Sequence, residues 1–133
     1  MLLTGSAQMD AERAFARARR RWLRRVRDRR LPVYDETHRR AAGIPKRLEL
    51  PLDSISGTVE PSRAVLFDGD FRPSKLARSR WERVWLAEHR GTVLPPISVV
   101  RVCNGYAVRD GHHRVSVARA RGAIAIDGIV EAI

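Results

Sequence analysis

The chain has 133 residues and a single cysteine, Cys103, so it fits one domain and has no intramolecular disulfide. No apolar run is long enough to span a membrane, and residues 1–3 are too short for a signal-peptide core, so we expect a cytoplasmic protein with no membrane partner. The net charge of +11 is uneven, because residues 1–47 contain 14 of the 26 Lys and Arg but 5 of the 15 Asp and Glu. The remaining residues have the charge balance of an ordinary globular domain.

The N-terminal segment predicts one long helix over residues 6–30. Alanine and arginine, both strong helix formers, dominate it. Phe15, Trp22 and Val26 form a narrow apolar stripe at helical spacing. Pro32 disfavours helix at the residue before it and ends the element.

Ten arginines lie between positions 13 and 30, and three interpretations compete for them. The helix is a solvated element with one stripe docked on the domain, or it binds nucleic-acid phosphates, which requires only clustered cations. The narrow stripe makes a helix lying on an anionic membrane the weakest of the three. No base-reading motif is visible, so any DNA binding is expected to be non-specific. The candidate nucleic-acid contacts are Arg17, Arg20, Arg21, Arg24 and Arg25.

The next segments predict a boundary between an extension and a domain. A short helix is expected over residues 35–42, and the chain then divides into a basic helical extension, 1–46, and a domain, 47–133. The domain is expected to open with a strand at 47–50 and a turn at 51–57.

An irregular loop is expected over residues 59–71, and loops of this kind often border a site. Glu60, Asp68 and Asp70 are carboxylates in this loop that could act as a base or bind a metal. More commonly such residues are solvated charges, and the sequence assigns none of them to a metal site.

A helix with a broad apolar face is predicted over residues 74–90. Leu76, Trp81 and Trp85 belong to that face. The two tryptophans are one turn apart and could line a base pocket, but packing against a sheet is the commoner role of such a pair.

The C-terminal part predicts a hairpin, a helix and a strand. Strands are expected at 97–102 and 106–109 around an Asn-Gly turn, followed by a helix at 112–121 and a kinked strand at 124–130. The fold class predicted is therefore α+β, a small domain with a mixed β-sheet, preceded by the basic N-terminal helix.

The segment DGHHR, residues 110–114, carries the strongest functional signal. Gly111 lies where the second hairpin strand turns into the helix, and the first-turn N–H groups there have no partner within the helix. Arg114 adds a fork of donors suited to phosphate oxygens. These residues predict a phosphate cradle. The plainer interpretation is that Asp110 caps a helix and that His and Arg are solvated.

The order of these features resembles the ParB/sulfiredoxin superfamily over residues 47–133. The matching features are a PISV strand at 96–99, the Asn104-Gly105 turn, the GHHR box at 111–114, Gly122 and the last strand at 126–130. The resemblance implies a small mixed sheet of the ParB/sulfiredoxin type with the box at a ligand site.

What the resemblance implies differs between branches. In ParB proteins the box reads GERR and holds the triphosphate of CTP; here Gly111 and Arg114 match, His113 replaces an arginine, and His112 replaces the glutamate implicated in hydrolysis. In sulfiredoxin the box reads GCHR, and its nucleophilic cysteine corresponds to His112, which argues against sulfinic reductase activity.

The box is also similar to that of the free-serine kinases of this superfamily, which transfer a phosphoryl group from ADP to serine. The resemblance implies Glu60 as the base, His113 and Arg114 on the phosphates, and His112 or Asp110 on the transferred group or Mg²⁺. Phosphoryl transfer depends mostly on positioning and charge neutralisation.

Together these features predict a ParB-like nucleotide-binding domain linked to DNA through its basic N-terminus. The expected ligand is a nucleoside di- or triphosphate, CTP, ATP or ADP, with Mg²⁺. A small-molecule phosphotransferase and a DNA-associated adaptor with a vestigial site are the alternatives. The sequence leaves open whether the protein is an enzyme and whether it forms a homodimer. The expected nucleotide contacts are Gly111, His112, His113 and Arg114, and the expected catalytic residues are Glu60, Asp110 and His112.

Overall fold

The structure, a computed structural model, describes residues 2–24, 30–35, 44–103 and 105–131, and it has the predicted α+β class. Two short 3-10 turns, Leu52–Ser54 and Lys75–Ala77, precede β2 and α3. The helices are α1 (Leu2–Arg24), α2 (Pro61–Ala64), α3 (Arg78–His89) and α4 (His112–Ala120). The strands are β1 (Lys46–Pro51), β2 (Ile55–Thr58), β3 (Ile97–Val102), β4 (Gly105–Asp110) and β5 (Ala125–Glu131).

The five strands form one mixed sheet in the order β1-β5-β3-β4-β2. β3 pairs with β4 as the predicted antiparallel hairpin and with β5 in parallel, while β1 closes the opposite edge antiparallel to β5. β2 and β4 are parallel. Their C-terminal ends therefore emerge at the same edge of the sheet, which brings the loop after β2 close to the start of α4.

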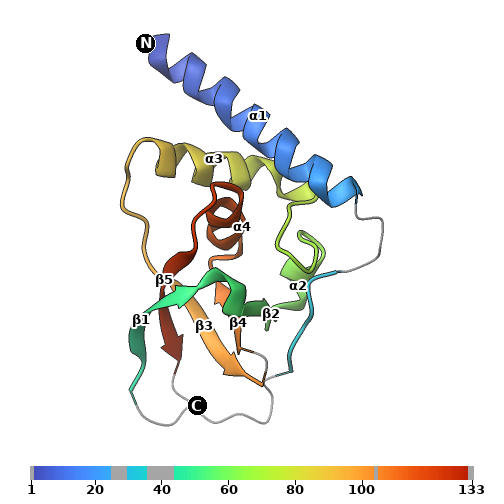
Figure 1. Cartoon of the computed structure of the whole chain (residues 1–133), viewed down its shortest axis with the longest axis vertical. Coiled ribbons are helices and arrows are strands. Elements are labelled where there is room, and N and C mark those ends of the chain that lie inside the picture. The colour runs from blue at the N-terminus through green and yellow to red at the C-terminus, as the bar shows by residue number, and fades with distance from the viewer. Residues whose placement is uncertain (1, 25–29, 36–43, 104, 132–133) are drawn as a thin grey trace.

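The helices are stacked on one face of the sheet. In Figure 1, α4 lies against the sheet, α3 crosses above it, and α1 lies outermost. Val115 and Val117 of α4 are fully buried in the main core. On the opposite face, Val100 and Val102 belong to a smaller cluster that Tyr34 covers. The alternation of Val99 and Val100 between the two clusters follows from the two-residue period of a strand.

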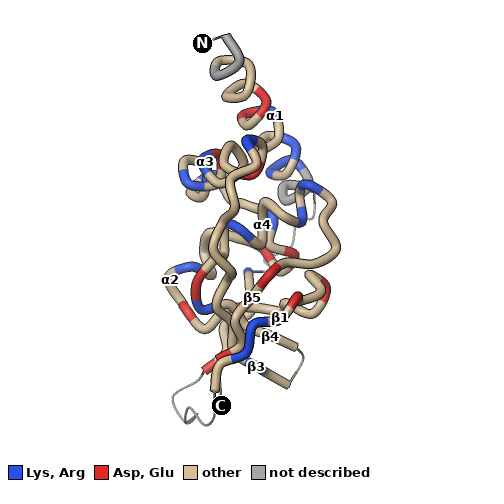
Figure 2. Tube along the Cα trace, turned by 90° about the vertical axis from the view of Figure 1, so that its left-hand side faces the viewer, with Lys and Arg blue, Asp and Glu red and all other residues tan. Residues whose placement is uncertain are grey.

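The N-terminal helix α1 packs on α3 through small residues and one aromatic ring. Ala11, Ala14 and Phe15 are buried, and the Phe15 ring meets Trp81 edge to face at 5.6 Å between centroids. Phe15 of the predicted apolar stripe is therefore docked on α3, while the side chain of Trp22 and all of Val26 lie outside the described part of the structure. Figure 2 shows Lys and Arg positions on α1 and α3 at the same end of the molecule.

The predicted extent of the N-terminal helix was wrong at its C-terminal end. Arg30 is not helical: it forms a β-bridge with Asp68, and the N–H of Leu31 donates to the carbonyl of Phe67 at 3.3 Å. Pro32 favours this extended backbone. Most of the short helix expected at 35–42 lies outside the described residues.

Three local predictions in the middle of the chain were also wrong. The segment expected as a turn at 51–57 contains part of β2, whose partner strand lies some 50 residues later, and the irregular loop at 59–71 contains α2. Leu76 is 76 % exposed, because it lies in the 3-10 turn before α3 and outside the buried face. Trp81 is fully buried, as expected for a core residue.

Candidate functional site

Gly111 connects β4 to α4, and its position admits no other residue without strain. Its φ of 110° lies in the region that side chains disfavour, and an added Cβ would stand 2.4 Å from Cγ2 of Ile97. No side chain caps the N-terminus of α4. The first-turn N–H groups of a helix have no acceptor within the helix, and here no capping side chain replaces one. The helix dipole also places partial positive charge at this end.

His112 is directed into the protein and connects α4 to the loop after β2. Its side chain is 3 % exposed, and its Nε2 lies 2.6 Å from Oγ1 of Thr58. The same Oγ1 accepts the backbone N–H of Glu60 at 2.8 Å. A short chain of hydrogen bonds thus runs from the box to Glu60.

His113 is also buried, against an aromatic ring of the loop. The Phe67 ring lies edge to face with His113 at 5.1 Å and is stacked with His112 at 6.4 Å. Burial lowers the pKa of both histidines to about 4, and nearby arginines lower each pKa further, chiefly Arg63 for His112 and Arg80 for His113. Both imidazoles are therefore neutral at pH 7.

The guanidinium of Arg114 is hydrogen-bonded to other groups of the protein. Its Nη1 donates to the carbonyls of Pro95 and Pro96, the latter at 3.1 Å, and its Nη2 donates to Asp110 at 3.1 Å. The side chain is 15 % exposed. Arg114 thereby fixes the segment before β3 against the start of α4.

Three arginines outside the box surround this end of α4, and the sequence prediction did not include them. Arg63 from α2, and Arg80 and Arg83 from α3, act electrostatically on His113, while Arg63 also acts on His112. Arg80 and Arg83 are exposed and three residues apart, so they share a helix face. That spacing was the available sequence signal. The site combines exposed or half-buried guanidinium groups with uncapped helix N–H groups, an arrangement suited to a multivalent anion.

The predicted acidic residues differ in their surroundings and in their hydrogen-bond partners. Glu60 lies beside the box, with its carboxylate 42 % exposed and 3.9 Å from Arg109, and Asp110 is 79 % exposed and paired with Arg114. Asp68 instead accepts the backbone N–H groups of Asp70 and Arg72, each at 2.9 Å, and supports its own loop. Burial raises the pKa of Asp68.

The described part of the candidate nucleic-acid surface is exposed. Arg17 and Arg20 of α1 are exposed; Arg21 and Arg24 are in α1, but their side chains are not described, and Arg25 lies outside the described residues. Within the described ranges, no helix is both long and apolar enough to cross a membrane. No group of three or more His, Cys, Asp or Glu side chains among these residues could hold a metal ion.

Comparison with known proteins finds similarity among solved structures alone. No family model and no curated protein matches the chain. Among solved structures, the fold is similar to sulfiredoxin from Arabidopsis thaliana, with 19 % identity and a TM-score of 0.48 over 66 % of this chain and 86 % of that one. At this level the similarity concerns the fold and assigns no activity to this chain.

Proposed function

We propose that this protein is a nucleotide-binding domain that holds the phosphates of a nucleoside di- or triphosphate at the N-terminus of α4. The observation that carries this proposal is the uncapped helix start at Gly111, together with three arginines, Arg63, Arg80 and Arg83, close enough to act electrostatically on His113. Backbone N–H groups at a helix start bind phosphate oxygens, and Gly111, with its φ of 110°, allows β4 to turn directly into this helix start.

The box side chains support this site in different ways. His112 and His113 are neutral and buried, so they position the first turn of α4 through Thr58 and Phe67. Arg114 fixes the helix start and presents its remaining surface to the ligand. Mg²⁺ would enter with the phosphates, since it prefers phosphate and water oxygens with one or two carboxylates, and the exposed carboxylates of Glu60 and Asp110 are the candidates to contact it.

Isothermal titration calorimetry with CTP, ATP and ADP, each with Mg²⁺, tests the proposal. Arg80→Gln and Arg83→Gln should each weaken the affinity about ten-fold, because a hydrogen bond to a charged group contributes about 1.5 kcal/mol or more. Arg90→Gln is the matched control, because Arg90 is exposed at the C-terminal end of α3. Binding of none of the three nucleotides would contradict the proposal and favour the adaptor with a vestigial site.

A phosphotransferase is the second candidate, and the position of Glu60 favours it. The backbone N–H of Glu60 is joined to the box through Thr58, and its carboxylate is 42 % exposed, so it is available to accept a proton from an attacking hydroxyl. Incubation with ADP, Mg²⁺ and L-serine, followed by ³¹P NMR, tests this activity. Glu60→Gln should retain nucleotide binding and abolish phosphoserine formation; no phosphoserine from the unmodified protein would exclude the serine-kinase reaction.

The exposed arginines of α1 support a further link to DNA. Arg17 and Arg20 are exposed, so phosphates can approach them. The proposed DNA contact is non-specific and therefore weakens steeply with salt.

A further inference from the structure

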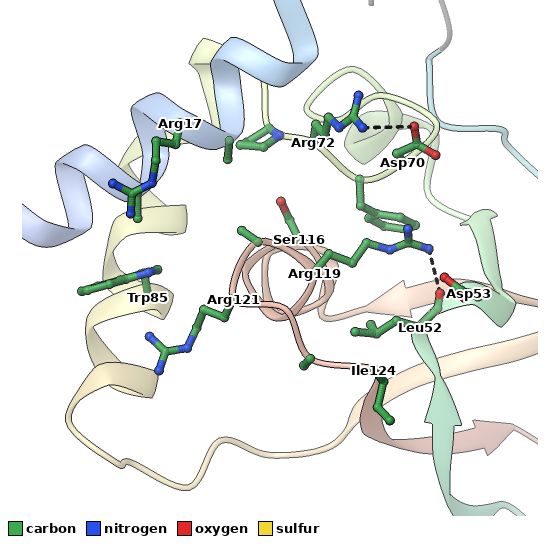
Figure 3. A pocket seen from close by; sticks show the side chains of 16 residues that line it. Arg17, Leu52, Asp53, Asp70, Arg72, Trp85, Ser116, Arg119, Arg121 and Ile124 are labelled. Carbon is green, nitrogen blue, oxygen red and sulfur yellow. Dashed lines mark hydrogen bonds and ion pairs between the residues drawn. The ribbon is translucent and has the colours of Figure 1, made fainter.

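A large cavity lies at the opposite end of α4 from the box. Its volume is about 750 Å³, within the range of small-molecule sites, and it is bounded by α1, α3, the C-terminal end of α4 and the loop at 70–73. None of the four box residues lines it. Figure 3 shows side chains from all these elements converging on this space.

The cavity is lined by four arginines and two aspartates. The arginines are Arg17, Arg72, Arg119 and Arg121, and the aspartates are Asp53 and Asp70. One aspartate, Asp70, is 3.9 Å from Nη2 of Arg72. Positive charge is therefore in excess around the cavity.

Two of these arginines are held in place with part of their hydrogen-bonding capacity unused. Nη2 of Arg119 donates to the carbonyl of Leu52 at 2.7 Å, which fixes its guanidinium beneath the cavity. Nε of Arg119 and Nη1 of Arg72 are buried and have no partner among the described residues. Buried cationic groups with unfilled donors are unfavourable alone, and a nearby anion offsets their charge.

Aromatic rings provide a flat apolar wall beside these charges. The guanidinium of Arg121 lies 5.4 Å from the Trp85 ring, and that of Arg119 lies 5.9 Å from Phe71. In Figure 3, Arg17 and Arg121 both extend towards Trp85. The Trp85 ring is also stacked with His89 at 4.8 Å and is 8 % exposed, so a ligand with a planar or apolar body would meet the part of the ring that remains exposed while its acidic groups reach the arginines.

The dipole of α4 disfavours an anion at this end of the helix, but its effect is reduced. The C-terminal end of a helix carries partial negative charge. The last carbonyls of α4 are occupied, because Val117, Ala118 and Arg119 accept the N–H groups of Arg121, Ala123 and Gly122, respectively. The four guanidinium groups therefore dominate the charge that a ligand meets.

We propose that this cavity is a second ligand site, for a small organic anion that has two or three acidic groups on a planar or apolar body. Its acidic groups are carboxylates or phosphates, and both chemistries suit the guanidinium fork. The site is separate from the proposed nucleotide site, so it is suited to a co-substrate or an effector.

Heteronuclear NMR on the full chain tests the cavity with defined probes. Benzene-1,3,5-tricarboxylate supplies a planar body with carboxylates, citrate supplies carboxylates without a ring, and pyrophosphate supplies phosphates without a body. We expect saturable shifts of the buried Arg119 Nε–H and the Trp85 indole signals, with the planar tricarboxylate binding most tightly. A comparison of the affinities for citrate and pyrophosphate shows whether the cavity prefers carboxylates or phosphates. Either preference supports the site.

Matched variants separate a site from general charge attraction. Arg17→Gln and Arg121→Gln should each weaken the affinity of the planar tricarboxylate about five- to ten-fold. Arg20→Gln, on the same helix but away from the cavity, should change it less than about two-fold, since an exposed charge is screened. Non-saturating shifts, or equal weakening in Arg20→Gln, would overturn the proposal.

Discussion

The two ends of α4 use the same residue types in opposite ways. At the N-terminal end, His112, His113 and Arg114 are turned into the protein, so the proposed phosphate contacts are left to backbone N–H groups and to arginines from other elements. At the C-terminal end, Arg119 and Arg121 themselves line an open cavity. The difference teaches that side chains of the same type can support the backbone at one end of a helix and line a cavity at the other.

The largest effect should come from a methyl group at Gly111. Gly111→Ala combines a disfavoured φ of 110° with a Cβ 2.4 Å from Ile97, so we expect a loss of about 4 kcal/mol in the free energy of unfolding. Urea denaturation measures it. Gly122→Ala is the matched control, because Gly122 has a φ of 81° and nothing within 4 Å, and it should cost only about 1 kcal/mol. Equal losses in the two variants would contradict the close packing at the box.

Acidification should weaken the fold through the buried histidines. The pKa of His112 and of His113 is lowered to about 4 in the folded protein, while the unfolded chain binds protons near pH 6.5. The unfolded state therefore binds more protons between these values, and stability falls as the pH drops from 7 to 5, by about 1–2 kcal/mol per histidine. Urea titrations at both pH values measure the change. In His113→Asn, the loss of unfolding free energy between pH 7 and pH 5 should be smaller. An unchanged loss would mean that other groups cause it.

Arginines at the two ends should differ in their contribution to stability. Arg114→Gln removes donors to Pro95, Pro96 and Asp110 and should cost about 1.5–3 kcal/mol. Arg121→Gln removes only an exposed contact with Trp85 and should cost about 0.5 kcal/mol. Thermal unfolding of the two variants compares them directly. A larger loss of stability in Arg121→Gln than in Arg114→Gln would contradict this prediction.

The smallest effect concerns DNA and involves neither end of α4. Arg20→Gln should reduce the slope of log affinity against log salt by about 1, because one phosphate contact is lost. Fluorescence anisotropy with a labelled duplex at several salt concentrations measures this slope. Arg101→Gln, an exposed position on β3, is the control and should leave it unchanged. A slope that stays the same in Arg20→Gln would remove α1 from the DNA contact.

Much of the C-terminal half was predictable from local signals. Alternating β-branched residues and a turn dipeptide predicted β3 and β4, and Gly111 correctly marked the start of α4. β2 was not predictable, because its four residues include Ser56 and Gly57 and its partner strand is distant in sequence. Its pairing depends on a tertiary contact that no local pattern encodes.

The candidate site was predictable in position but not in orientation. The sequence located the box at residues 111–114 but could not show that His112 bonds Thr58, which lies 54 residues earlier. The sequence placed Arg80 and Arg83 on one helix face, but it could not show that they and Arg63 act on the box, since that depends on the tertiary placement of α2 and α3. The cavity at the other end of α4 arises in the same way, from elements far apart in the chain.

The most direct test of the nucleotide site is a ¹H–¹⁵N correlation spectrum during titration with CTP, ATP or ADP and Mg²⁺. The account predicts that the backbone N–H signals of Gly111, His112 and His113 shift in a saturable manner while the Arg119 Nε–H signal stays in place. Shifts at Arg119 with unchanged signals at Gly111 would place the nucleotide at the wrong end of α4 and contradict the account.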